Sequence, residues 1–327
     1  MAAYDLILFD LDGTLTDPKE GITKSVQYAL AKHGIHVEDR GSLIPFIGPP
    51  LLDSFRHFYG FDEGQARQAV ADYREYFAVT GMYENAVFPG IPALFEDLTA
   101  AGKQLAVATS KPTVFAKQIL SHFGLDGYFT HIVGSNLDGT RCVKGEVVAA
   151  ALELFPEVDR RCVIMVGDRE HDIIGAKANG IASLAVAYGY GSLEELEAAG
   201  ADQIAGSIDA IAPLLAYPVL QSILPSGEGQ VVIGTVPAPF AFAVLSARVL
   251  ADAVDGANGE IAKAQGGDAD IRIIPRHRAD TVSFEVNVSA DRCQPLWPVV
   301  AEALSRLHAD LPAIKREAER LERSCRK

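Results

Sequence analysis

Several features that would assign a chain of 327 residues to a particular class are scarce in this one. Cysteine is one of them: Cys142, Cys162, Cys293 and Cys325 are scattered and never form a CxxC pair. Their spacing argues against a zinc ribbon and against a disulfide scaffold. It fits a reducing cytosol, so we expect a cytoplasmic protein.

Long apolar runs are also lacking. The longest stretch without a charged residue, 229–247, contains Pro237 and Pro239. A helix that crosses a bilayer needs about 20 consecutive, mainly apolar residues. We therefore expect a buried strand and the start of a helix in this stretch, and no membrane segment. Asp5 and Asp10 interrupt the first residues, so we expect no export signal either.

Positive charge is in deficit, because the formal net charge is −14. Nucleic-acid polymers and anionic membrane surfaces bind through clustered Lys and Arg, so neither is expected as a partner. A small anionic substrate remains compatible if local cations bind it. Residues 1–220 carry −13 and residues 221–327 carry −1, and a turn-rich stretch lies at 225–229. We place a domain boundary at about 217–229.

What the first part does contain is a regular alternation of short apolar runs and helical patterns. The expected strands are Asp5–Phe9, Gln104–Ala108, Thr130–Val133, Val163–Val166 and Leu184–Ala187. The expected helices between them are Phe115–Phe123, Lys144–Leu154, Asp172–Asn179 and Leu193–Ala199. This order predicts an α/β fold, a doubly wound parallel sheet with helices on both faces.

The alternation fails over about residues 17–88, where helical patterns such as Gly21–His33 and Glu63–Phe77 follow one another. An insert after the first strand is expected to act as a lid over the carboxyl edge of the sheet. Open α/β sheets bind their ligands at that edge.

Two carboxylates, Asp10 and Asp12, directly follow the first strand and precede Gly13. Burying such charges is costly without partners, and a divalent cation is one such partner. Asp10 would then bind the cation and act as a nucleophile. Asp12 would offer its backbone carbonyl to the cation and its side chain as an acid and base. The alternative is a turn in which an Asp side chain caps the backbone, with no catalytic or metal-binding role.

Three further segments place polar residues at strand ends or helix starts. Thr109 and Ser110 follow the second strand of the alternation, and Lys144 opens a helix. Asp168 and Asp172 follow another strand, and their spacing predicts both carboxylates on one face of a starting helix. For the hydroxyl and carboxyl residues, the structural alternative is a helix cap or a turn. For Lys144 it is a solvated surface side chain. All four segments in this order favour a phosphate site with a metal.

Residues 1 to about 217 resemble the haloacid dehalogenase (HAD) superfamily of phosphohydrolases. The motifs that carry the resemblance are Asp10-Leu11-Asp12-Gly13-Thr14, Thr109, Lys144 and Gly167-Asp168-x-x-x-Asp172. The insert resembles the helical C1 cap of that superfamily. The resemblance implies a HAD-like Rossmannoid core and Mg²⁺-dependent hydrolysis of a phosphate monoester through an aspartyl-phosphate at Asp10.

The resemblance also implies a role for each site residue. Asp12 would be the acid and base, and the Mg²⁺ ligands would be Asp10, Asp12, Asp168 and Asp172. The transferring phosphoryl group and its substrate would be bound by Thr109, Ser110, Lys144 and Arg141.

Within the superfamily, the chain is most similar to the phosphoglycolate phosphatase-like group, and there to 5′-nucleotidases. The similar segments are Ile47–Leu51, Tyr83–Asn85, Ala108–Pro112, Gly134–Arg141 and Tyr188–Gly191. This similarity implies a small phosphorylated metabolite, with a nucleoside 5′-monophosphate as the first candidate. Phosphoglycolate, a sugar phosphate and a phosphomutase reaction stay open, as does a regulatory or binding protein on the same fold.

Side chains around the expected site have two interpretations each. Gly48-Pro49-Pro50 would face the nucleophile, or would be an ordinary turn between helices. Lys111 and Arg169 would add positive charge at the rim, or would be solvated. Tyr188 and Tyr190 would stack on a base, or would pack at a strand end.

The resemblance does not cover residues 226–327, for which we expect an accessory α+β domain. The expected strands are Val231–Thr235, Ile271–Ile274 and Val282–Val288, and the expected helices are Phe240–Val254, Trp297–His308 and Ala313–Arg326. Arg276-His277-Arg278 would bind an anion at a hairpin turn or be solvated. The domain would serve a homodimer or a protein partner.

Overall fold

The computed structural model describes residues 4–216, 222–226, 230–233, 254, 256–258, 272–278, 281–289, 302–303 and 306. The chain divides into two compact units, Ala2–Asp202 and Gln203–Lys327. The domain boundary at about 217–229 and the accessory domain over 226–327 stay predictions. Within the described part of the chain, no helix is long and apolar enough to cross a membrane.

A five-stranded parallel sheet forms the centre of the first unit. Its strands are β1 (Leu6–Phe9), β4 (Gln104–Pro112), β5 (His131–Ser135), β6 (Val163–Gly167) and β7 (Ala182–Val186). The strand order is β5-β4-β1-β6-β7, and every neighbouring pair is parallel. The predicted parallel sheet is confirmed, and β1 lies in its middle.

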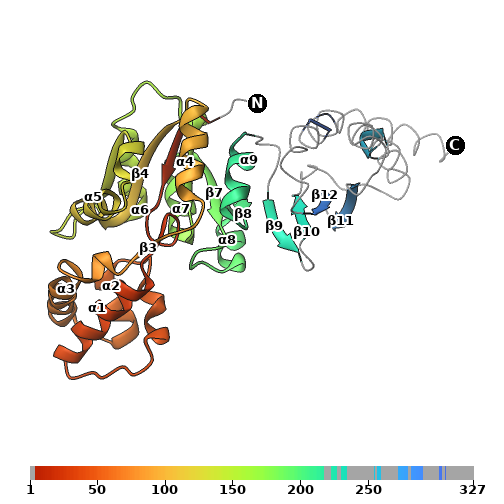
Figure 1. Cartoon of the computed structure of the whole chain (residues 1–327). Helices are drawn as coiled ribbons and strands as arrows, with labels where there is room; N and C mark the ends of the chain where they lie inside the picture. Colours follow the sequence, from red (N-terminus) through yellow and green to blue (C-terminus); the bar gives the residue numbers. More distant parts are fainter. Residues whose placement is uncertain are drawn as a thin grey trace. The chain divides into compact units, whose positions relative to one another are not determined.

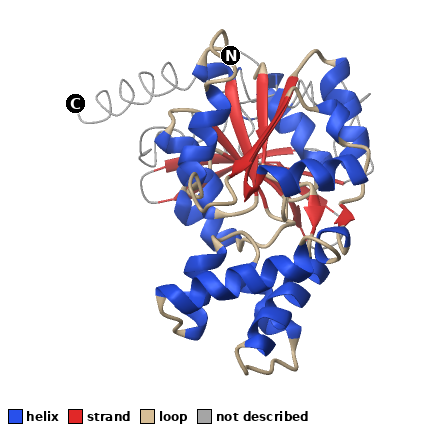
Figure 2. Cartoon of the chain, turned by 90° about the vertical axis from the view of Figure 1, so that its left-hand side faces the viewer, coloured by secondary structure: helices blue, strands red, loops and turns tan. Residues whose placement is uncertain are grey.

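Helices cover both faces of this sheet (Figure 2). They are α4 (Ile91–Ala100), α5 (Thr113–His122), α6 (Lys144–Leu152), α7 (Glu170–Ala178) and α8 (Leu193–Ala199). Leu6 and Leu8 pack with α6 and α7 in one hydrophobic cluster. Phe9 points to the opposite face, where its ring meets Phe95 of α4 edge-on at 5.5 Å. Because both faces of β1 are buried, only its carboxyl end is free to carry polar chemistry.

The insert forms a separate group of helices on one side of the sheet (Figures 1 and 2). Its elements are β2 (Thr16–Asp17), α1 (Lys19–Lys32), η1 (Arg40–Phe46), α2 (Leu51–Tyr59), α3 (Glu63–Phe77), η2 (Gly81–Tyr83) and β3 (Ala86–Val87). Strands β2 and β3 pair antiparallel where the chain leaves the core and returns to it. We call residues 17–88 the cap.

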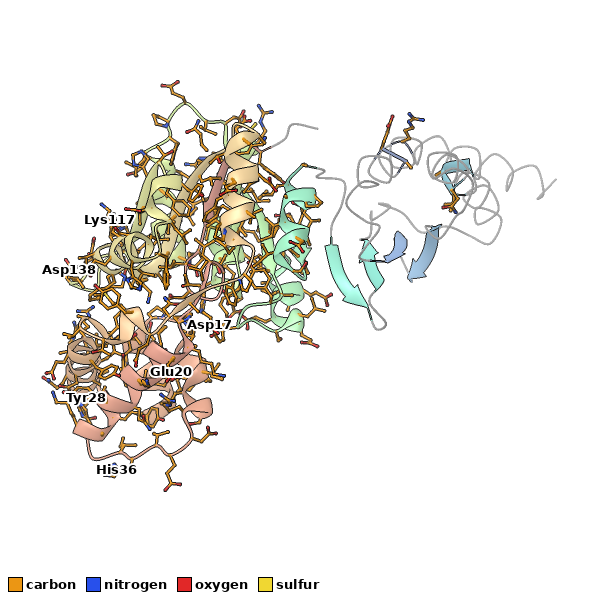
Figure 3. The ribbon with its side chains drawn as sticks, in the orientation of Figure 1. Asp17, Glu20, Tyr28, His36, Lys117 and Asp138 are labelled. Atoms are coloured by element: carbon orange, nitrogen blue, oxygen red, sulfur yellow. The ribbon has the colours of Figure 1, made fainter. Side chains whose placement is uncertain are left out.

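An ion-pair cluster joins α1 to α3 inside the cap. The Asp72 carboxylate, 4% exposed, lies 2.7 Å from Lys32 Nζ and 3.1 Å from His33 Nε2. On the outer side of α1, the Tyr28 hydroxyl donates to Glu75 at 3.0 Å (Figure 3). Asp72 is therefore a buried carboxylate whose charge is balanced from the neighbouring helix.

The described residues of the second unit contain five paired strands. The elements are β8 (Gln203–Ala205), η5 (Ile208–Ala210), α9 (Ile211–Ala216), β9 (Ser222–Ser226), β10 (Gln230–Ile233), β11 (Arg272–Arg278) and β12 (Thr281–Ser289). The strand order is β8-β9-β10-β12-β11. Only the β8–β9 pair is parallel.

The predicted hairpin is confirmed as β11 and β12, but Arg276–Arg278 belong to strand β11 and not to its turn. Their backbone pairs with Thr281–Ser283, which extends the ladder beyond the expected strand. The expected helices at 240–254, 297–308 and 313–326 lie outside the described residues, apart from four single positions.

Candidate active site

The loop after β1 brings two acids and a glycine to the carboxyl edge of the sheet. Asp10 is 6% and Asp12 is 9% exposed. Gly13 has φ +84°, and a Cβ there would lie 2.2 Å from Asp168 Oδ2. Glycine is required at this position because the backbone is left-handed and passes against the Asp168 carboxylate.

The second pair of acids follows β6. The expectation that Asp168 and Asp172 share one face of a helix is wrong, because α7 begins only at Glu170. Arg169 has extended backbone, with φ −125° and ψ 158°, so Asp168 belongs to the preceding turn. Asp172 lies in the first turn of α7 and accepts from the Arg169 amide at 3.1 Å. The bend at Arg169, and not helical spacing, makes the two carboxylates converge.

Three carboxylates meet in the interior. Oxygen atoms of Asp10, Asp168 and Asp172 lie within 4.8 Å of one another, and all three residues are buried. Burial, with Asp172 and Asp10 nearby, raises the pKa of Asp168 well above its usual range. Hard divalent cations such as Mg²⁺ prefer carboxylate oxygens. The donor set therefore fits such an ion, which would relieve the mutual repulsion of the acids.

Lys144, the first residue of α6, inserts its ammonium group among these acids. Its Nζ lies 2.7 Å from Asp10 Oδ1 and 2.7 Å from Asp172 Oδ1, and it donates to the Ala108 carbonyl at 3.1 Å. Burial by itself would lower the pKa of Lys144, but Asp10 and Asp172 raise it above its ordinary value. The group is therefore a cation at neutral pH and lies next to Asp10.

Lys111 lies deeper than the rim position expected from the sequence. Its side chain is 5% exposed, and Nζ lies 2.8 Å from Asp12 Oδ2. Its backbone amide donates to Thr109 Oγ1 at 3.3 Å. Burial raises the pKa of Asp12, and Lys111 opposes that effect. Sequence reasoning missed this pair, although Lys111 is only two residues from Thr109 at the same strand end.

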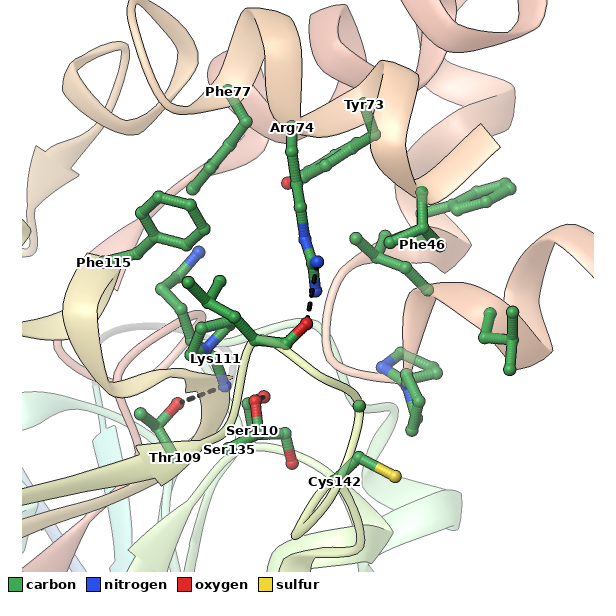
Figure 4. A pocket seen from close by; sticks show the side chains of 18 of the residues that line it. Phe46, Tyr73, Arg74, Phe77, Thr109, Ser110, Lys111, Phe115, Ser135 and Cys142 are labelled. Carbon is green, nitrogen blue, oxygen red and sulfur yellow. Dashed lines mark hydrogen bonds between the residues drawn. The ribbon is translucent and has the colours of Figure 1, made fainter. Parts of the chain in front are cut away.

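A cavity of about 370 Å³ lies between the cap and the core (Figure 4). Asp10, Asp12, Thr109 and Ser110 line it from the core, and the Gly48–Pro50 turn lines it from the cap, as expected. Sequence reasoning missed the further lining residues Phe46, Tyr73, Arg74, Phe77 and Phe115. In the sequence, these side chains look like the buried face of an ordinary helix. Their position at the cavity becomes visible only once the cap is placed on the core.

Arg74 reaches across this cavity from the cap. Its Nη1 donates to the Leu137 carbonyl at 2.9 Å, which joins α3 to the loop after β5 (Figure 4). On the core side, Arg169 donates to the Ile47 carbonyl at 2.8 Å and pairs with Glu195 at 2.8 Å. Two arginines therefore hold cap and core together through backbone carbonyls.

Several expected site residues are not among those that line the cavity: Lys144, Asp168 and Asp172 lie behind Asp10, and Arg141, Arg169, Tyr188 and Tyr190 make other contacts. Arg141 donates to the Gly134 carbonyl at 2.9 Å and to Asn136 at 3.2 Å, so its substrate contact stays a prediction. Tyr188 donates to the Thr14 carbonyl at 2.8 Å, and Tyr190 donates to Asp17. The two tyrosines brace the segment that follows Asp12.

The chain matches known proteins over its first two thirds. The sequence model for haloacid dehalogenase-like hydrolases matches residues 7–186. A 5′-nucleotidase from Pseudomonas aeruginosa is 55% identical over 195 residues, which are 60% of this chain and 88% of that protein. The tyrosine-protein kinase PtkA from Mycobacterium tuberculosis is 41% identical over 192 residues, 59% of this chain and 65% of that protein. The chain thus spans less than two thirds of the kinase.

Among solved structures, a predicted phosphatase from Clostridium acetobutylicum is 53% identical. The match has a TM-score of 0.63 and covers 64% of this chain and 97% of that one. The fold of this part of the chain is therefore shared with that phosphatase.

Proposed function

Because the chain belongs to the haloacid dehalogenase-like hydrolase family, we propose that it hydrolyses phosphate monoesters through a phosphoryl group carried on Asp10. The observation that supports this most is the buried meeting of Asp10, Asp168 and Asp172 beside the Lys144 ammonium. A carboxylate so placed, at the inner end of a covered cavity, is suited to attack phosphorus.

We propose that the cofactor is Mg²⁺. Asp10, Asp168 and Asp172 would hold it through carboxylate oxygens, and Asp12 through its backbone carbonyl. The bound ion would offset negative charge on the phosphoryl oxygens. The fit of the buried acids supports this assignment.

The chain's own groups account for the remaining requirements of the reaction. Lys144 orients the Asp10 carboxylate and would offset negative charge on the phosphoryl group, and the Thr109 hydroxyl would donate to a phosphoryl oxygen. Asp12 gives a proton to the leaving oxygen and later takes one from the attacking water. The cap covers the cavity and limits the access of other water.

We propose a nucleoside 5′-monophosphate as the substrate. The cavity volume of about 370 Å³ is in the range of small-ligand sites, and phosphoglycolate would fill only part of it. The relative named 5′-nucleotidase supports the same choice. A panel of nucleoside monophosphates, phosphoglycolate and sugar phosphates tests it. We expect the highest kcat/KM for a nucleoside monophosphate, and a preference for phosphoglycolate would contradict the choice.

We further propose that the protein acts in the cytoplasm, which the scattered cysteines support. Residues 226–327 would mediate a homodimer or contact a protein partner. Ser110 and Arg141 would assist Thr109 and Lys144 in binding substrate.

The enzymatic proposal is tested by p-nitrophenyl phosphate hydrolysis in the presence of Mg²⁺. We expect Asp10→Asn to abolish turnover, because an amide cannot form the covalent intermediate. Asp97→Asn, at an exposed acid on α4, is the matched control and should hydrolyse at the wild-type rate. Equal rates for wild type and Asp10→Asn would instead favour a binding or regulatory protein on the same fold.

A further inference from the structure

The Lys111 ammonium contacts two groups from different parts of the first unit. It forms the ion pair with Asp12 Oδ2 at 2.8 Å, and it lies 4.4 Å from the ring centroid of Phe77. A cation over an aromatic face at this distance is attracted by the ring, and more strongly when water is excluded. With its side chain 5% exposed, Lys111 is largely shielded from water.

These contacts connect the core to the cap. Lys111 lies near the end of β4 in the core, whereas Phe77 is the last residue of α3 in the cap. The Phe77 ring stacks on Tyr73 at 5.2 Å and meets Phe115 of α5 edge-on at 5.4 Å. Figure 4 shows Phe77, Phe115 and Lys111 on the same side of the cavity. The ring that covers the ammonium therefore reaches it only when the cap lies on the core.

The pairing leaves the two oxygens of Asp12 in different states. Oδ2 is engaged by Lys111, whereas Oδ1 is buried and has no hydrogen-bond partner among the residues that the structure describes. Asp12 also lines the cavity, so its carboxyl group borders the space that a substrate would occupy. The Lys111 contact thus selects one orientation of the carboxyl group.

We propose that Lys111 is a positioning residue, which fixes the orientation of the Asp12 carboxyl group for proton exchange with substrate, and that Phe77 maintains this contact when the cap covers the site. The proposal rests on the proposed phosphatase function. In the first step, an Asp10 carboxylate oxygen bonds to phosphorus, the leaving oxygen takes the electron pair of its bond to phosphorus, and that oxygen receives the proton of the Asp12 carboxyl group. In the second step, the Asp12 carboxylate takes a proton from the water whose oxygen bonds to phosphorus, and the bond between Asp10 and phosphorus breaks, with its electron pair returning to Asp10.

A second role for Lys111 would be direct binding of the phosphoryl group. The two roles differ in their dependence on the leaving group. A positioning residue for the acid matters most when the leaving oxygen needs a proton, as in an alkyl phosphate. It matters little for p-nitrophenolate, which leaves as an anion. A residue that binds the phosphoryl group affects both substrates equally.

The test compares kcat/KM for β-glycerol phosphate and p-nitrophenyl phosphate, since this constant reports steps through transfer to Asp10. For Lys111→Met we expect a loss of about 100-fold with the alkyl ester, the scale of general acid catalysis. With p-nitrophenyl phosphate the loss should be within about threefold, since little acid catalysis is needed there. Phe77→Leu should show the same selectivity with a loss of about fivefold, as a cation–π contact of about 1 kcal/mol predicts.

Lys117→Met is the matched control, because Lys117 is exposed on α5 (Figure 3), and it should leave both constants unchanged. Equal losses with both substrates, or no loss with either, would overturn the proposal for Lys111. Thermal unfolding checks that each variant folds. If Lys111→Met does not fold, the selectivity of Phe77→Leu between the two substrates tests the proposal. A wild-type protein inactive on both esters would refute the proposed function instead.

Discussion

Charge balance among single residues supports the proposed divalent cation at this site. The site buries four carboxylates, those of Asp10, Asp12, Asp168 and Asp172, and two ammonium groups, those of Lys111 and Lys144. With all six groups ionised, two negative charges remain. Buried charges without partners are strongly unfavourable, so the acids either bind protons or share a cation of matching charge. Burial raises the pKa of Asp168, and the neighbouring carboxylates of Asp172 and Asp10 raise it further.

Asp168→Asn tests this balance. The change removes one metal ligand and one of the repelling charges. We expect the Mg²⁺ concentration for half-maximal activity to rise by about 10- to 100-fold or more, the range of losses seen around metal sites. In EDTA, however, the variant should unfold at a temperature no lower than the wild type.

The matched control is again Asp97→Asn, which should change neither quantity. An Mg²⁺ midpoint for Asp168→Asn equal to that of the wild type would show that Asp168 is not a ligand.

At the scale of elements, helices α1 and α3 determine the shape of the cap, and Asp72 links them. Burial by itself would raise the pKa of Asp72, but hydrogen bonds from Lys32, Gln68 and His33 lower it below its ordinary value. A carboxylate whose folded pKa is lowered stabilises the fold above its unfolded pKa of about 3.9. That contribution disappears as the pH falls through the lowered folded pKa.

Asp72→Asn is expected to lower the free energy of unfolding by about 1–2 kcal/mol at pH 7, because its charge-assisted bonds are partly solvent-screened. The difference from wild type should shrink below about pH 4, as the wild-type carboxylate takes up its proton. Urea unfolding from pH 7 to pH 3 measures both effects. Glu75→Gln, at the 52% exposed partner of Lys32, is the control and should change little. A difference that stays constant down to pH 3 would exclude the ionic origin.

Helices with a clear hydrophobic periodicity were predictable from the sequence. Features that depend on contacts distant in sequence were not. The helices at Leu193–Ala199 and Glu63–Phe77 match the prediction residue for residue. Helix α4 was missed, although Ile91, Leu94 and Leu98 are spaced along one buried stripe. The bend before α7 was missed because nothing in the local pattern shows that Arg169 is extended.

The site was predictable in its composition and only partly in its contacts. Asp10 and Thr109 could be named because polar residues at the ends of buried strands are costly without partners, and Lys144 could be named because it opens a helix. The Lys111–Asp12 pair could not, since a lysine after a strand is usually solvated. Its burial depends on Phe77 from the cap, which is distant in sequence.

At the scale of the whole molecule, the proposed catalytic and metal-binding residues all lie in the first compact unit, Ala2–Asp202. The family match, over residues 7–186, lies within the same unit. Gln203 Nε2 donates to the Leu214 carbonyl at 2.9 Å, so β8 and α9 are held together within the second unit. A cut after residue 220 therefore retains that contact.

A chain of residues 1–220 should remain soluble and hydrolyse p-nitrophenyl phosphate at close to the full-length rate. Circular dichroism and thermal unfolding check its fold, and light scattering compares its mass with that of the full chain. A monomeric truncated chain beside a dimeric full chain would support the proposed dimer role of residues 226–327. Loss of the folded core on truncation would contradict the expected boundary.

The most direct test is to locate the covalent intermediate. Asp12→Asn should bind Mg²⁺ almost as the wild type does, because only the Asp12 backbone carbonyl is proposed as a ligand. It should nevertheless accumulate or slowly turn over the phosphorylated enzyme, because the base for hydrolysis is lost. Acid quenching of Asp12→Asn with p-nitrophenyl phosphate and Mg²⁺, followed by peptide mass spectrometry, should place one phosphoryl group on Asp10. A phosphoryl group on any other residue, or the same yield from Asp10→Asn, would contradict the mechanism.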